Sequence, residues 1–226
     1  MKIQKVFFLN GLGLKLAAWL HVPEGKGPFP AVIRTHGYRS NKDRTSSTAL
    51  AEEFSHDKIV FLRFDFHAHG ESEGKVVDAR QCVDDVMCAI AYLRTLGVVD
   101  GKKIAITGSS LGGLATTLAA AWDDVACAVP VCPVSTYEPF SSRAIDYHAL
   151  PKHNVYGEAR KIKCPVLVVH GDKDETVPIE QSVELVKHLK KGKLHIVQGA
   201  DHKFSNEKHF NEMITTVADF IRKVIL

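Results

Sequence analysis

Short apolar runs alternate with longer amphipathic stretches along the 226 residues, and this alternation constrains the fold more than any other feature. Eight runs are rich in β-branched or aromatic residues and continuous in their apolarity, as is typical of strands buried on both faces. They are Ile3–Leu9, Leu14–His21, Ala31–Thr35, Ile59–Phe64, Lys103–Thr107, Val125–Val131, Pro165–His170 and Leu194–Val197. The first two predict a hairpin that turns through Asn10 and Gly11.

Apolar residues three and four positions apart predict helices between most of these strands. The predicted helices are Thr45–Ser55, Val77–Leu96, Ser110–Trp122, Ile179–Leu189 and Asn206–Val224. Such alternation favours an α/β fold, with a mostly parallel central sheet of about eight strands flanked by helices. Because no repeat or linker divides the chain, we predict one domain over residues 1–226. Sheets of this type bind ligands beyond the carboxyl ends of their strands, so reactive residues are expected there.

The composition is that of an ordinary globular protein, with 45% hydrophobic and 24% charged residues. The net charge is only +3 and the basic residues are scattered, which argues against nucleic acid as a partner. The five cysteines lack metal-ligand spacing, and their odd number favours reduced thiols. The N-terminal apolar run is too short for a signal peptide and no stretch resembles a membrane span, so we expect a cytoplasmic protein that does not contact membranes.

The strongest chemical signal is the segment Gly108-Ser109-Ser110-Leu111-Gly112, which follows a predicted strand and opens a predicted helix. A serine nucleophile on a sharp strand-to-helix turn needs glycines around it, because side chains would clash there. The helix that follows also favours negative charge developing near the serine. Ser110 is therefore the predicted nucleophile. Ser109 is the competing candidate, but it lacks glycines placed symmetrically on either side.

Serine needs a base, and the base needs a group that orients it. With Ser110 as nucleophile, the expected chain order is serine, then an acid, then histidine. Asp172, Asp174 and Glu175 follow the predicted strand Pro165–His170, and we choose Asp174 because the other two can equally shape a turn. His202 follows the predicted strand Leu194–Val197 and is the predicted base. His188, His195 and His209 fall within predicted helices or a strand and are expected to be structural.

A tetrahedral intermediate also needs donors for its oxyanion. The backbone N–H of Leu111, directly after the nucleophile, is the first predicted donor. The second is the N–H of Tyr38, because Gly37 lets the loop after the third strand turn inward.

A pair of histidines, His67 and His69, has acidic residues nearby, which raises the alternative of a metal site. The segment ends in a glycine-rich turn without a further ligand cluster, so we predict neither a metal nor an organic cofactor.

Five pieces of the sequence together resemble the α/β-hydrolase superfamily, and within it small esterases of the cinnamoyl/feruloyl and serine-aminopeptidase-like group. The pieces are HGY, RFDFHAHGESEG, GSSLGG, GDKDETVP and GADHKF, which span residues 36–204 in family order. The resemblance implies an α/β-hydrolase fold and catalytic roles for Ser110, Asp174 and His202. It also implies that residues 65–72 form a structural loop.

One segment departs from that family. Relatives acting on phenolic esters carry a large cap between the sixth and seventh strands, whereas residues 132–164 here form only a short insertion. We expect a minimal cap in which Tyr137, Phe140 and Tyr147 contact substrate, with His148 and Tyr156 as further candidates; all of them can equally be packing residues.

The predicted function is hydrolysis of small to medium carboxylic esters, with a small-molecule ester as partner. A thioesterase, an amidase or peptidase and an acyltransferase remain alternatives, as does a non-catalytic ligand-binding protein. The sequence leaves open whether the protein is a monomer or a homodimer.

Overall fold

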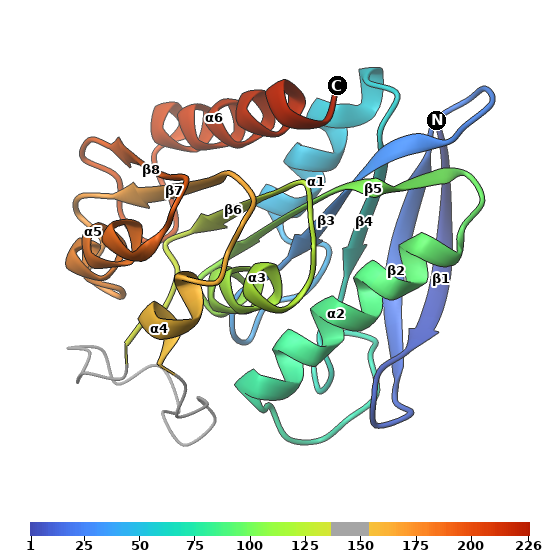
Figure 1. Cartoon of the computed structure of the whole chain (residues 1–226), viewed down its shortest axis with the longest axis horizontal. Helices are drawn as coiled ribbons and strands as arrows, with labels where there is room; N and C mark the ends of the chain where they lie inside the picture. Colours follow the sequence, from blue (N-terminus) through green and yellow to red (C-terminus); the bar gives the residue numbers. More distant parts are fainter. Residues whose placement is uncertain (137–153) are drawn as a thin grey trace.

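The computed structural model describes residues 1–136 and 154–226, which form a twisted central sheet covered by helices on both faces (Figure 1). Eight strands lie in the order β1-β2-β4-β3-β5-β6-β7-β8. The neighbours β1–β2 and β2–β4 are antiparallel, and the remaining pairs are parallel. The strands are β1 (Lys2–Leu9), β2 (Lys15–Val22), β3 (Phe29–Thr35), β4 (Val60–Phe64), β5 (Val99–Ser109), β6 (Cys127–Val131), β7 (Val166–Gly171) and β8 (Gly192–Val197).

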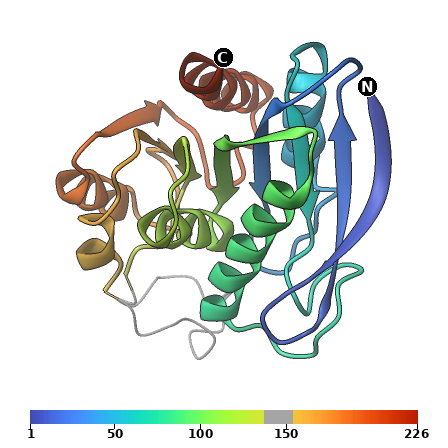
Figure 2. The same cartoon turned by 45° about the vertical axis from the view of Figure 1, so that its right-hand side comes forward.

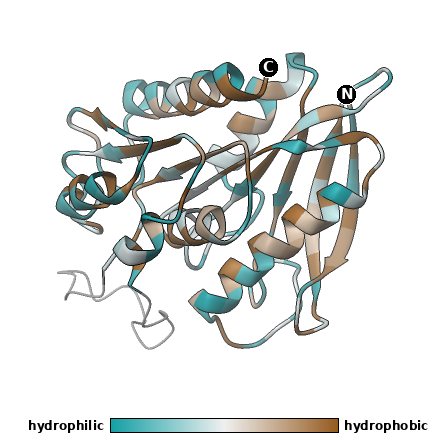
Figure 3. Ribbon diagram, viewed as in Figure 1, coloured by the Kyte–Doolittle hydropathy of each residue, from teal (hydrophilic) through white to brown (hydrophobic). Residues whose placement is uncertain are grey.

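The helices form two layers, as the turned view in Figure 2 also shows. On one face, α2 (Ala79–Thr95), α3 (Leu111–Trp122), α4 (Val155–Ala159) and α5 (Ile179–His188) cover the larger hydrophobic core. On the other face, α1 (Thr45–Glu53), the short 3₁₀ helix η1 (Phe54–His56) and α6 (Glu207–Ile225) cover a second core. Hydrophobic and hydrophilic residues alternate around α2 and α6 in Figure 3, as expected of helices with one buried face.

The predicted fold class is confirmed, because every predicted strand and helix has a counterpart in the structure. The boundaries differ where the local sequence is misleading. Strand β5 begins at Val99, although Asp100 and Gly101 read as a turn, because Val99 pairs with Phe29 across a register shift. Helix α4 was not predicted, since its five residues are too few to show helical periodicity. No helix in the described ranges is both long and apolar enough to cross a bilayer.

Candidate active site

Ser110 lies on a strained turn between β5 and α3, as the sequence predicted. Its backbone φ is +56° and ψ is −114°, a conformation that non-glycine residues rarely adopt. A Cβ at Gly108 would clash with Thr35 Oγ1, and a Cβ at Gly112 would lie 2.6 Å from the carbonyl oxygen of His36. Both glycines are therefore required by the close approach of β3. Ser110 itself is 8% exposed, at the carboxyl end of its strand.

The structure brings the predicted acid and base into direct contact. Asp174 follows β7 and His202 follows β8, and His202 Nδ1 lies 2.7 Å from Asp174 Oδ2. The Asp174 side chain is fully buried, whereas the His202 side chain is 17% exposed. Because Nδ1 donates to the carboxylate, Nε2 is the nitrogen that is left to accept a proton. The competing Asp172 instead accepts a hydrogen bond from the N–H of Gly199, which is the turn-shaping role considered for it.

Asp174 has further donors besides His202. The N–H groups of Thr176 and Val177 each donate to its Oδ1 at 2.8 Å. On the other oxygen, Oδ2, His170 Nε2 lies at 3.2 Å. Burial alone would raise the pKa of this carboxyl, but the hydrogen bonds from His170 and His202 hold the pKa of Asp174 well below its usual range. Asp174 therefore stays ionised beside His202.

His170, at the end of the predicted strand Pro165–His170, contacts Asp174 as well. Its side chain is completely buried on β7. Nε2 faces two acceptors, the carbonyl of Val177 at 2.9 Å and the Asp174 carboxylate, so the proton is assigned to Nε2. Nδ1 then accepts from the hydroxyl of Ser182 on α5, 2.6 Å away. The only local sign of this role is a histidine four residues before the acid.

A short series of contacts connects the serine turn with the acid. The N–H of Ser110 donates to the carbonyl of Val131 at 2.9 Å, and the N–H of the next residue, Cys132, donates to the carbonyl of Val169 at 2.8 Å. The thiol of Cys132 is fully buried against Asp174, and burial raises its pKa well above the ordinary value. Ser110 and Asp174 thus lie at the same edge of the sheet, two strands apart.

The loop after β3 packs against Ser110. A Cβ built on Gly37 would lie 3.5 Å from Ser110 Cβ. The N–H of Phe66 donates to His36 Nε2 at 3.1 Å, so the proton of this ring is on Nδ1, which donates to the carbonyl of Gly37 at 2.8 Å. The carbonyl and the N–H of a trans peptide point in opposite directions, so this bond turns the N–H of Tyr38 away from His36.

Two imidazoles hold this loop in their neutral forms. Burial lowers the pKa of His36 to about 4. His69 accepts the N–H of Arg39 on Nε2 at 3.2 Å and donates from Nδ1 to the carbonyl of His67, and burial lowers its pKa as well. The other predicted oxyanion donor, the N–H of Leu111, is at the first residue of α3, where backbone N–H groups have no partner within the helix.

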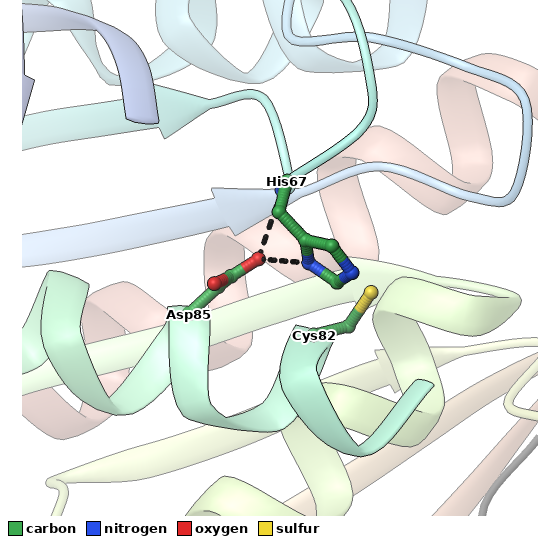
Figure 4. A group of neighbouring side chains, drawn as sticks. All are labelled: His67, Cys82 and Asp85. Atoms are coloured by element: carbon green, nitrogen blue, oxygen red, sulfur yellow. Dashed lines mark hydrogen bonds and ion pairs between the residues drawn. The ribbon is translucent and has the colours of Figure 1, made fainter. Parts of the chain in front are cut away.

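In the segment after β4, His67 forms hydrogen bonds with Asp85, a residue of α2 (Figure 4). The backbone N–H and Nδ1 of His67 both contact Asp85 Oδ2, at 2.9 and 2.7 Å. Nε2 of His67 accepts the N–H of Asp78, and Asp85 Oδ1 accepts from the amide of Asn10. Cys82, from the same helix as Asp85, lies beside them, and the three side chains are close enough to ligate one ion. Both ring nitrogens of His67 already have hydrogen-bond partners. Through these bonds and the bond from Asn10 to Asp85, the cluster joins this loop to α2 and to the β1–β2 turn.

The predicted cap residues Tyr137, Phe140 and Tyr147, together with His148, lie outside the described residues. Tyr156 is described and lies on α4, where its ring stacks on His188 at 5.2 Å between centroids. Tyr156 therefore packs α4 against α5.

A cavity of about 560 Å³ lies at the opposite end of the sheet, where β6 and β7 begin. Its lining includes Lys161, Lys163, Cys164 and Lys191 and none of the predicted catalytic residues.

Comparison with known proteins identifies the family. Residues 65–226 match the prolyl oligopeptidase family. A thiohydrolase of Eupenicillium brefeldianum is 35% identical over 140 residues, which cover 60% of this chain and 44% of that protein. The quorum-quenching protein AidA of Acinetobacter baumannii is 32% identical over a stretch that covers 57% of this chain and 43% of AidA. The chain thus spans less than half the length of these two relatives. Palmitoyl-protein thioesterase ABHD10 of Rattus norvegicus is 24% identical over 88% of this chain and 77% of its own.

Solved structures agree with the fold. Est1E of Butyrivibrio proteoclasticus with bound ferulic acid has a TM-score of 0.85 at 25% identity, covering 97% of this chain and 99% of that one. The esterase Pf2001 of Pyrococcus furiosus also has a TM-score of 0.85, at 22% identity, covering 100% of this chain and 94% of that one. This similarity concerns the fold alone. The chain therefore belongs to the prolyl oligopeptidase family, has the α/β-hydrolase fold and resembles feruloyl esterases.

Proposed function

We propose that the protein hydrolyses carboxylic esters of small to medium acyl chains, with Ser110 as nucleophile, His202 as base and Asp174 as the acid that orients it. The observation that carries this proposal is the 2.7 Å contact between His202 Nδ1 and Asp174 Oδ2, at the same edge of the sheet as the strained turn of Ser110. Esterases and thioesterases among the similar proteins support it.

The proposed reaction follows from these positions. Ser110 Oγ attacks the ester carbonyl while its proton passes to His202 Nε2, and the N–H groups of Tyr38 and Leu111 receive the oxyanion. Collapse of the tetrahedral intermediate breaks the ester bond, and the alcohol leaves with the proton from His202. Water then attacks the acyl-enzyme with His202 again as base, which releases the acid and restores Ser110.

Labelling with a fluorophosphonate probe, together with p-nitrophenyl acetate turnover, tests the nucleophile. Ser110→Ala is expected to abolish labelling and to lower turnover by several orders of magnitude, because the triad members act together. Ser109→Ala is the matched control and is expected to keep the labelling. Labelling lost in Ser109→Ala but kept in Ser110→Ala would refute the assignment. A purified wild-type protein that neither labels nor turns over any ester would instead indicate a ligand-binding protein.

A series of p-nitrophenyl esters tests the acyl preference. The insertion over residues 132–164 is short, and each extra methylene gains roughly 0.8 kcal/mol only where the protein buries it. We expect kcat/KM to be highest from acetyl to hexanoyl and to fall for lauroyl and longer chains. An optimum at dodecanoyl or beyond would contradict a small, open cap.

Thioester hydrolysis is the second candidate, and the thiohydrolase and thioesterase relatives favour it. Esters and thioesters with the same acyl group separate the two activities, since only the leaving group differs. A higher kcat/KM for the ester at each chain length supports the first proposal. Amide substrates and an alcohol acceptor, assayed in parallel, reveal peptidase or acyltransferase activity.

A further inference from the structure

Arg34 is a buried cation with unpaired donors. It lies on β3 and is 1% exposed, and its Nη2 donates to Ser109 Oγ at 2.7 Å and to Ser46 Oγ at 3.1 Å. Its Nε and Nη1 are buried and have no hydrogen-bond partner among residues 1–136 and 154–226. Leaving charged donors buried and unpaired costs free energy, so a guanidinium in this state calls for a partner.

No carboxylate of the described ranges forms an ion pair with Arg34, in contrast to a neighbouring arginine. Arg63 is the register partner of Arg34 on β4, and it pairs with Asp43 and also donates to the carbonyl of Lys42. Asp43 is thus already engaged. Burial without a carboxylate lowers the pKa of Arg34 to about 10, which leaves it charged at neutral pH.

The second positive group beside Arg34 is the N-terminus of α1. The helix begins at Thr45, its N-cap Arg44 supplies no side-chain cap, and its first turn holds no acidic residue. Ser46, which contacts Arg34, and Ser47 both lie in this turn, and the buried Ser47 Oγ also has no described partner. The first N–H groups of a helix carry a partial positive charge of roughly +0.5. Arg34 therefore contacts the first turn of a helix that supplies no acidic side chain there.

We propose that Arg34, Ser47 and the N-terminus of α1 form a buried site for a small monovalent anion of chloride size. A single negative charge matches one guanidinium and one helix N-terminus, and the near-complete burial of Arg34 and Ser47 restricts the ligand to a few atoms. The site is next to the turn of Ser110, because Arg34 also donates to the hydroxyl of the preceding residue, Ser109.

Thermal unfolding in chloride, with gluconate replacing it at constant ionic strength, tests the site. An anion that binds only the folded chain raises Tm in a saturable way. The wild type is expected to show this rise, and Arg34→Met to lose it. Arg63→Met is the matched control: it removes a neighbouring guanidinium that has its own carboxylate, so the chloride response is expected to persist. A crystal grown in bromide should show an anomalous peak beside Arg34 Nε or Nη1.

Ser47→Ala keeps the test decisive if Arg34→Met does not fold. It removes one donor to a charged group and is expected to raise the apparent Kd for chloride about tenfold or more. An equal chloride response in the wild type, Arg34→Met and Ser47→Ala would overturn the proposal. A crystal with only an ordered water beside Arg34, or bromide only on surface lysines, would overturn it as well.

Discussion

Acidification should destabilise the loop after β3, which packs against Ser110, because it protonates His36. The folded protein uses His36 as a neutral ring that accepts the N–H of Phe66 and donates to Gly37, and burial lowers its pKa from 6.5 to about 4. The unfolded chain binds a proton to this histidine near pH 6.5, whereas the folded chain resists protonation until about pH 4. The stability that His36 contributes is therefore present above pH 6.5 and is lost as the pH falls from 6.5 to 4.

The pKa shift sets the size of this loss. One pKa unit corresponds to about 1.4 kcal/mol, so the full loss at low pH is about 3 kcal/mol and the loss at pH 5 is about 2 kcal/mol. His36→Gln removes the titration, while its amide oxygen remains able to accept the N–H of Phe66. The variant is expected to be less stable than the wild type at pH 7, because the oxygen and nitrogen of its amide do not occupy the positions of the two ring nitrogens.

Urea unfolding at pH 7 and pH 5 measures the effect. Between these two pH values the free energy of unfolding of the wild type should fall by about 2 kcal/mol more than that of His36→Gln. His21, which lies on β2 away from His36, titrates in both proteins, so its contribution cancels in the comparison. Equal pH dependence in the two proteins would refute the argument that a neutral His36 holds this loop.

Four further outcomes are expected. Asp174→Asn should lower turnover by up to about 10⁴-fold with the fold intact, whereas Asp172→Asn should be mild; the reverse order would show the wrong acid was chosen. His170→Leu should lower kcat/KM about tenfold and alter the pH profile of kcat, while His170→Gln, which keeps a donor, should recover most of the loss. Gly108→Ala should destabilise the fold by about 2 kcal/mol or more in thermal unfolding, whereas Gly11→Ala has open space around it and should not. Incubation with EDTA should leave ester turnover unchanged, and loss of activity with a stoichiometric metal would contradict this.

The features that the sequence predicted well depend on local geometry or on a general property of parallel sheets. The turn at Ser110 needs glycines within two residues of the serine, so the requirement is visible in the sequence itself. Asp174 and His202 are 28 positions apart, but both follow strands whose carboxyl ends meet at one edge, and the structure indeed brings them into contact. Strand β5 was harder to delimit, because its first residues are polar.

The roles of His170, His36 and Arg34 were not predicted, because they depend on contacts that no sequence spacing reveals. His170 and His36 are two of twelve histidines, and only the structure shows that His170 contacts Asp174 and that His36 contacts the loop next to Ser110. Arg34 lies within the apolar run Ala31–Thr35, which predicts only a buried strand. Its importance comes from the lack of an acidic partner among the described residues.

The position of β8 at the edge of the sheet has a consequence for heat inactivation. This strand pairs with β7 on one side only, and most of its residues are only partly buried. Edge elements with few buried contacts open locally at a lower free energy than the core requires for global unfolding. His202 is carried by the loop that follows β8, whereas Ser110 and Asp174 follow interior strands. Local opening of β8 would thus separate His202 from Asp174 while the rest of the sheet remains folded. With these two residues in the proposed triad, activity would decline below the melting temperature of the protein.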